Sequence, residues 1–144
     1  MLFRSTGTII TFKPDSEIFD TTIYEKEILR NRFREMAFLN KGVKIIFTDE
    51  REDFTETFHY EGGIKSFVEY MNRNKNSLHS EVIYFQGQRS DSQVEISMQY
   101  TDGYSENVLT FANNIHTPEG GSHLVGFRTA LTRTLNDRDR KSVV

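Results

Sequence analysis

The chain has 144 residues, of which 36% are hydrophobic and 27% are charged, and its formal net charge is −3. A weakly acidic chain of ordinary composition has no global field that attracts nucleic acid or membrane, so any nucleic-acid contact must come from a local basic patch. The chain has no cysteine, which excludes a disulfide framework and fits a reducing cytoplasm, and no apolar run long enough to cross a membrane. We therefore expect a cytoplasmic protein with no membrane partner.

The first part of the chain predicts two short strands and a helix. Residues 6–12 (TGTIITF) are rich in β-forming side chains, and residues 18–24 are a second candidate strand. Residues 25–41 are expected to form a helix that ends at Gly42. The apolar stripe of this helix recurs at helical spacing and consists of Ile28, Leu29, Phe33, Met36 and Ala37.

The middle of the chain predicts a hairpin followed by a second helix. Apolar and β-branched residues at 43–48 and 55–60 flank the charged segment 49–53, which is expected to be the tip of the hairpin. A helix then opens after Gly62-Gly63. Its stripe consists of Ile64, Phe67, Val68 and Met71.

The last part of the chain predicts three strands and a final helix. Strands are expected at 82–88, 94–100 and 108–113, and in the second of these apolar and polar residues alternate, which is typical of a strand with one buried face. The final helix is expected at about 121–136, with leucines and Phe127 along one side. The order β, α, ββ, α, βββ, α predicts an α+β fold with helices packed on one face of a sheet.

Two similar turns precede helices, Tyr60-Glu61-Gly62-Gly63 and Pro118-Glu119-Gly120-Gly121. Open backbone N–H groups at a helix start attract anions, so each turn is either a phosphate cradle or a tight turn whose glutamate complements the helix dipole. No lysine follows the glycines at the spacing of a nucleotide-binding loop. The tight-turn interpretation is therefore preferred.

Few side chains are candidates for chemistry. Arg128 lies at the edge of the final apolar stripe, and it either covers core surface with its stem or aims a cation at phosphate; the residues alone favour the first interpretation. The four histidines lack metal-ligand spacing, so no zinc site is expected. No serine, histidine and carboxylate spacing indicates a nucleophile. Taken by themselves, the residues predict no catalytic site and no metal site.

Long stretches of the chain resemble the DNA gyrase B family. They are TGTIITFKPDSEIF, FREMAFLNKGVKIIFTDE, FHYEGGIKSFVEYMNRNK, IYFQGQRSDSQVEISMQYTDGYSENVLTFANNI and EGGSHLVGFRTALTRTLND. The resemblance implies that residues 1–20 are the terminal strands of an incomplete GHKL-type ATPase domain. It implies that residues 21–144 are a transducer domain, incomplete at its C-terminal part, with the fold of the second domain of ribosomal protein S5 and a mixed sheet with helices packed on one face.

The resemblance also implies roles for individual residues. Thr8 in the TGT motif matches a threonine that lines the adenine pocket, and Ile10 matches the apolar residue beside it. Arg128 in the GFR motif matches an arginine that faces the clamp interior where DNA passes. The family's other nucleotide-contacting residues have no counterpart in this sequence. ATP and Mg²⁺ are therefore expected for the full-length enzyme, whereas the isolated chain is expected to be inactive and to need no cofactor.

Two departures from the family pattern bear on these expectations. Ser122 stands where the family usually has threonine, but either hydroxyl can cap a helix, so little changes. The final residues, DRDRKSVV, differ more from the family pattern, and the C-terminal part of the transducer is expected to be incomplete.

The family resemblance implies a type IIA DNA topoisomerase that uses ATP to supercoil DNA by duplex passage. This segment is then expected to relay ATP-driven clamp closure to the DNA gate. The partners implied are DNA, gyrase A and a second copy of gyrase B. Two alternatives stay open. One is a fragment of the B-subunit of topoisomerase IV, and the other is a non-enzymatic S5-like module that binds nucleic acid or another partner.

Overall fold

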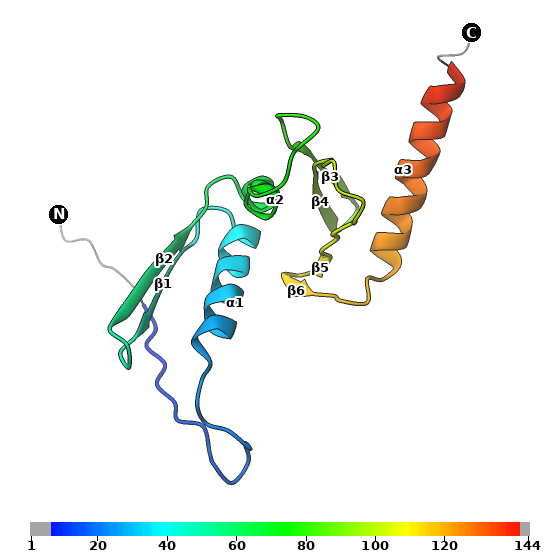
Figure 1. Cartoon of the computed structure of the whole chain (residues 1–144). Coiled ribbons are helices and arrows are strands. Elements are labelled where there is room, and N and C mark those ends of the chain that lie inside the picture. Colours follow the sequence, from blue (N-terminus) through cyan, green and yellow to red (C-terminus); the bar gives the residue numbers. More distant parts are fainter. Residues whose placement is uncertain (1–6, 142–144) are drawn as a thin grey trace, which may run out of the picture.

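The computed structural model describes residues 7–141 (Figure 1). In chain order its elements are α1 (Lys26–Leu39), β1 (Lys44–Asp49), β2 (Phe54–His59), α2 (Ile64–Asn72), β3 (Ile83–Arg89), β4 (Ser92–Met98), β5 (Phe111–Ala112), β6 (Ile115–His116) and α3 (Ser122–Lys141). The predicted α+β class is confirmed. None of the helices in this described range is long and apolar enough to cross a membrane.

The strands pair as separate hairpins. Across the described residues they form two-stranded antiparallel sheets, β1–β2, β3–β4 and β5–β6, in place of the single mixed sheet that was expected. Each strand pairs with its neighbour in sequence because a short turn joins them. In β5–β6 that turn is Asn113-Asn114, with φ angles of 50° and 64°. Positive φ angles at both turn residues match the twist of the two strands that a two-residue hairpin connects. β6 was not predicted, and β5 is shorter than the expected strand 108–113.

The predicted strands before α1 are absent from the described residues. Position 6 lies outside the described range, and residues 7–12 are extended without a strand partner. The side chains of Ile9, Ile10 and Phe12 are 95%, 81% and 73% exposed. Residues 18–24 also form no strand. The preference of such residues for strands reflects packing against a neighbouring strand, and no described segment supplies one here.

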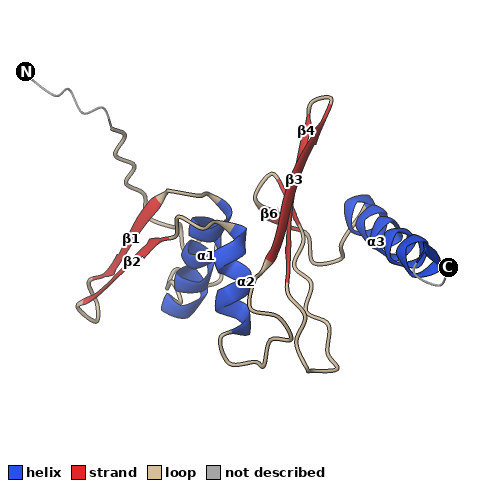
Figure 2. Cartoon of the chain, turned by 90° about the horizontal axis from the view of Figure 1, so that it is seen from above, coloured by secondary structure: helices blue, strands red, loops and turns tan. Residues whose placement is uncertain are grey.

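The interior lies where α1 packs on the β1–β2 hairpin and α2 packs against α1; these four elements are called the helix–hairpin body below (Figure 2). Phe38 and Phe58 are fully buried, and the ring of Phe38 stacks on Tyr60 and Phe67 at centroid distances of 3.6 and 4.8 Å. Aromatic side chains of this size supply most of the apolar area that a small interior can bury. The helix–hairpin body is therefore organised around Phe38.

The buried face of α1 differs from the predicted stripe. Ala37 and Phe38 are buried, whereas Ile28 is 62% exposed. Arg30 and Arg34 lie on the packed face and bond to Glu56 of β2, and Ile28, two residues before Arg30, falls roughly 200° around the helix from it. A helical wheel on which only apolar residues are marked does not identify a helix face that packs through the aliphatic stems of arginines.

The remaining elements extend from this body. β4 packs against α2, and Asn72 Nδ2 donates a hydrogen bond of 3.1 Å to Gln99 Oε1 just after β4. α3 begins where predicted, continues to Lys141, and projects away from the helix–hairpin body (Figure 1). Its Val125 and Leu135 are 65% and 55% exposed. α3 therefore offers long solvent-facing surfaces.

Candidate nucleic-acid interface

The turn before α3 fixes where that helix begins. Gly120 donates its backbone N–H to the Thr117 carbonyl at 2.9 Å and has a φ angle of 77°. A Cβ at Gly120 would lie 2.8 Å from Leu124 Cδ2, so only glycine fits there without a shift. His123 Nε2 lies 3.4 Å from Thr117 Oγ1 and ties the helix start to the turn. This geometry favours the tight-turn interpretation of the glycine pair.

The other glycine pair is placed similarly before α2. Gly63 is buried, has a φ angle of 60°, and lies against the Phe38 carbonyl and the Lys41 side chain. A Cβ at Gly62 would lie 2.1 Å from Ser66 Oγ. Both glycines therefore allow the chain to turn closely against its own backbone and side chains.

Arg128 lies in the second turn of α3 and points to a loop rather than to the core. Its Nη2 donates to both carboxylate oxygens of Glu106, at 3.1 and 3.0 Å. The Arg128 and Glu106 side chains are 54% and 66% exposed, so water reaches the ion pair from the open side. Arg128 thus presents a cation at the surface, held by one carboxylate from residues 99–110, the loop between β4 and β5.

That loop also borders a polar depression. A space of about 230 Å³ opens between two loops and is lined by Asn74, Lys75, Asn76, Thr101, Asp102, Gly103 and Ser105. Asn76 Nδ2 donates to Asp102 Oδ2 at 2.9 Å, and the Asp102 N–H donates to the Asn76 carbonyl at 3.1 Å. These bonds hold the loop that carries Glu106 to the loop that follows α2.

Thr8 and Ile10 lie in the extended segment before α1, and both are exposed. Figure 1 shows this segment and α3 on different sides of the helix–hairpin body. The structure therefore does not bring Thr8 and Ile10 together with Arg128. As sites, they are independent of each other.

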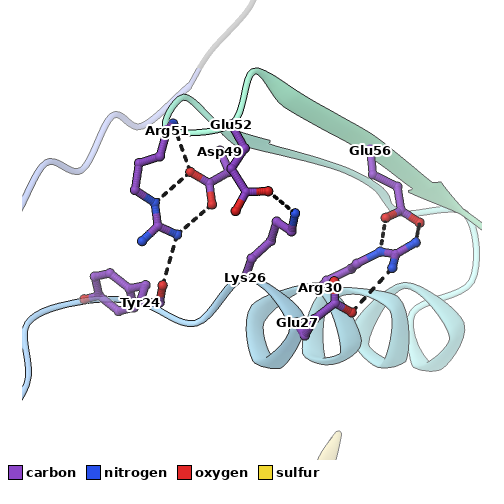
Figure 3. A network of polar contacts seen from close by, with 8 residues as sticks. All are labelled: Tyr24, Lys26, Glu27, Arg30, Asp49, Arg51, Glu52 and Glu56. Atoms are coloured by element: carbon purple, nitrogen blue, oxygen red, sulfur yellow. Dashed lines mark hydrogen bonds and ion pairs between the residues drawn. The ribbon is translucent and has the colours of Figure 1, made fainter.

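A network of charged side chains joins α1 to the β1–β2 hairpin (Figure 3). Arg30 bonds to Glu56 and reaches Glu27, and Lys26 pairs with Glu52. Arg34, from the next turn of α1, lies 3.3 Å from the same Glu56 carboxylate. Two arginines therefore share the Glu56 carboxylate where α1 meets β2.

The network shifts the acidity of two carboxyl groups. Hydrogen bonds from the Arg51 guanidinium lower the pKa of Asp49 from 3.8 to about 2, against the opposing effect of burial. Hydrogen bonding to Arg30 lowers the pKa of Glu56, again against burial and with a smaller contribution from Arg34. Both groups are held in their charged form, which suits a structural role and not proton transfer.

The described residues provide no group of three or more histidine, cysteine, aspartate or glutamate side chains that could hold a metal ion. Of their carboxylates with shifted pKa, Asp49 pairs with Arg51 within the hairpin, and Glu56 pairs with arginines of α1. What the surface offers instead is an exposed arginine on a projecting helix, which suits contact with a polyanion.

A family model described as DNA gyrase B matches residues 63–143. The chain belongs to the DNA gyrase B family. The DNA gyrase B-subunit of Clostridium acetobutylicum is 60% identical over 136 residues, which cover 94% of this chain and 21% of that protein. The Bacillus mycoides protein of the same name is 54% identical over 139 residues, which cover 95% and 34%. The chain thus spans between a fifth and about a third of these gyrase B relatives.

Solved gyrase B structures share the arrangement of this chain. The 43K ATPase domain of Thermus thermophilus gyrase B, determined in complex with an aminocoumarin, aligns with a TM-score of 0.79 and 35% identity. The alignment covers 91% of this chain and 36% of that one. The B-subunit of DNA gyrase from Myxococcus xanthus aligns with a TM-score of 0.77 and 26% identity over 82% of this chain and 34% of that one.

Sequence reasoning reached Arg128 through the gyrase B resemblance but missed its partner. Glu106 is 22 positions away in a loop, where no periodicity links the two residues. The charged network of α1 did leave a signal. Lys26, Arg30 and Arg34 recur every four residues on one helix face, and Glu56 shares a strand face with Phe54 and Phe58.

Proposed function

We propose that the chain is the transducer segment of a DNA gyrase B protein, which forms part of a type IIA topoisomerase that uses ATP to introduce negative supercoils by duplex passage. In this role it relays ATP-driven clamp closure to the DNA gate. The observation that carries the proposal is the gyrase B family match across residues 63–143, supported by 60% identity to a gyrase B relative over 94% of the chain.

The proposed domain boundary falls near residue 20. Residues 1–20 would be the terminal strands of the ATPase domain, and residues 21–144 would be the transducer, with its S5-like fold incomplete at the C-terminal part. The contrast between the extended residues 7–15 and the helix–hairpin body that starts at α1 supports this division.

Thr8 and Ile10 are proposed as one wall of the adenine pocket. A threonine hydroxyl and an aliphatic side chain suit the polar edge and the flat face of a base, and both residues are exposed and so accessible to a ligand. These two residues fit the adenine base of ATP as one wall of its pocket and contact no other part of the nucleotide in this proposal. ATP, when bound in the whole protein, supplies the free energy of hydrolysis. The described residues do not fit a Mg²⁺ site, because they form no cluster of three or more carboxylate or histidine side chains.

Arg128 is proposed as the DNA contact. Its exposed guanidinium provides N–H donors for phosphate oxygens. Phosphate oxygens are the groups that a protein contacts when it binds a duplex irrespective of the base sequence. The further partners of the proposed function are gyrase A and a second copy of gyrase B in the clamp.

The whole-protein proposal is tested with the full-length gyrase B that contains this segment, combined with gyrase A. We expect ATP-dependent negative supercoiling of a relaxed plasmid. Decatenation without supercoiling would replace gyrase by topoisomerase IV. Absence of both activities, together with DNA or protein binding by the segment, would favour the non-enzymatic module.

The role of Arg128 is tested by Arg128→Ala in the same full-length protein. We expect DNA-stimulated ATPase activity to fall about three- to tenfold, since a charged contact to phosphate is lost, while basal ATPase activity changes less. The matched control is Arg133→Ala, whose side chain on α3 is 84% exposed and lies 4.0 Å from Asp137. Equal loss of basal and stimulated activity would show that Arg128 acts on the structure of the protein and not on DNA.

A further inference from the structure

The arginine proposed to contact DNA is already bound to an anion of the chain itself. Both oxygens of Glu106 accept hydrogen bonds from Arg128 Nη2, at 3.0 and 3.1 Å. A carboxylate and a phosphodiester both present two oxygens to a guanidinium and compete for the same N–H donors. Glu106 therefore occupies the position in which phosphate oxygens would bind Arg128.

This ion pair is exposed, in contrast to the ion pair around Glu56. The Arg128 and Glu106 side chains are 54% and 66% exposed, whereas the Glu56 side chain is 25% exposed and bonds to two arginines. Exposed ion pairs contribute little to stability, and salt screens them. Duplex DNA carries about one negative charge per 1.7 Å of its axis, which is a far denser anion than a single carboxylate. The Glu106 pair is thus weak enough for DNA to replace it.

The ion pair also links α3 to the loop 99–110. The carboxylate at position 106 follows Ser105, which lines the polar depression together with residues of the loop after α2. Loss of the Glu106 contact would release the Arg128 side chain from this loop, because Arg128 makes no other side-chain bond to the described part of the chain. The contact therefore has two states, one closed on Glu106 and one open to an external anion.

We propose that Glu106 is an internal competitor for DNA at Arg128, and that duplex DNA displaces its carboxylate when it binds. This inference rests on the proposed role of Arg128 as a DNA contact. Glu106 lowers the affinity of the site for DNA, and it keeps the arginine in one orientation while DNA is absent. Binding of DNA and release of the Glu106 carboxylate from Arg128 are then one event.

The test uses the full-length protein and a short fluorescent duplex at about 0.1 M salt, where charges more than about 10 Å apart are largely screened. Affinity is measured by fluorescence anisotropy for the wild type, Glu106→Gln, Arg128→Ala and the double variant. We expect Glu106→Gln to tighten DNA binding about two- to fivefold, as loss of an exposed ion-pair competitor predicts. In the Arg128→Ala background the same substitution should give no such gain.

The matched control is Glu119→Gln, which makes the same change in net charge. Glu119 is exposed and makes no ion pair with the described part of the chain. If Glu106→Gln and Glu119→Gln act equally, or if Glu106→Gln acts equally with and without Arg128, the competitor role is overturned although Arg128 still binds DNA. If Arg128→Ala leaves the affinity unchanged, the DNA contact proposed above fails, and the competitor role fails with it. Circular dichroism of each variant checks that the fold is retained.

Discussion

The helix–hairpin body and α3 use the same kinds of side chain in different ways. In the body, apolar residues of α1 reach full burial, and Phe38 is 1% exposed. On α3, no apolar residue at helical spacing is fully buried: Leu124, Phe127 and Leu131 are half-buried, and Leu135 is 55% exposed. A periodic stripe thus shows which face of a helix is able to pack, whereas burial depends on the presence of a partner. Stability is concentrated in the body, and the exposed charge proposed for function lies on α3.

The ion pairs of the two regions also differ in how far they are shielded from water. In the body, Glu56 is shared by Arg30 and Arg34 and is largely shielded from water. Beside α3, Glu106 holds a single arginine in the open. The first arrangement fixes two elements against each other, and the second is free to exchange partners. The following experiments test whether this division between a stable body and an exchangeable surface is real.

The largest effect is expected from Phe38→Ala. Removal of a fully buried aromatic ring that stacks on Tyr60 and Phe67 leaves a cavity, and the free energy of unfolding should fall by about 3–5 kcal/mol. Urea unfolding of the 144-residue chain, followed by circular dichroism, measures the change. Phe12→Ala is the control, because that ring is 73% exposed, and its effect should stay within about 0.5 kcal/mol. Similar losses for both variants would contradict a stable core confined to the body.

A smaller effect is expected from Glu56→Ala. The substitution leaves Arg30 and Arg34 without their shared carboxylate on a partly buried face, and the free energy of unfolding should fall by about 1–2 kcal/mol. The same urea experiment applies. Glu69→Ala removes an exposed glutamate from α2 and should change stability by no more than about 0.5 kcal/mol. A neutral Glu56→Ala would mean that this network contributes no more than an exposed ion pair.

The acid stability of the body should depend on Asp49. Because Arg51 lowers the pKa of Asp49 from 3.8 to about 2, the folded state binds the proton less readily than the unfolded state. The resulting stabilisation is present above the unfolded-state value and is lost as the pH falls from about 4 toward about 2. The melting temperature, measured across this range, should fall less steeply in Asp49→Asn than in the wild type. Identical pH profiles would show that the Asp49–Arg51 pair is not formed in solution.

The smallest effect is expected from ATP on the isolated chain. Thr8 and Ile10 are exposed and provide one wall of a nucleotide site, so titration of the 144-residue chain with ATP in a calorimeter should give no binding heat. The full-length gyrase B is the positive control. Measurable affinity in the isolated chain would mean that the extended segment before α1 is not a passive fragment of a larger site.

Periodicity predicted the helices and the main hairpins because their local patterns agree with the packing that they reach. α1, α2 and α3 lie within a few residues of the predicted ranges, as do β1 to β4. The strand predicted at 6–12 failed in its described part because pairing is not a local property. β6 was missed because Asn113-Asn114 supports a hairpin only when both residues adopt positive φ angles.

The candidate site was predictable only in part. Arg128 stood out through a motif, whereas Glu106 became visible only when folding brought a loop beside α3. Local patterns do not encode such contacts, because any of several exposed carboxylates in the sequence has the same chemistry.

The extended residues 7–12 also bear on the solubility of the isolated chain. They contain no charged side chain, and Ile9, Ile10 and Phe12 are open to solvent. Such a stretch presents unpaired backbone N–H and C=O groups beside apolar side chains, which is the combination that recruits an identical stretch from another molecule. We expect the solubility of the isolated chain to be governed by these few residues, and Ile9→Lys should raise the concentration at which aggregates form.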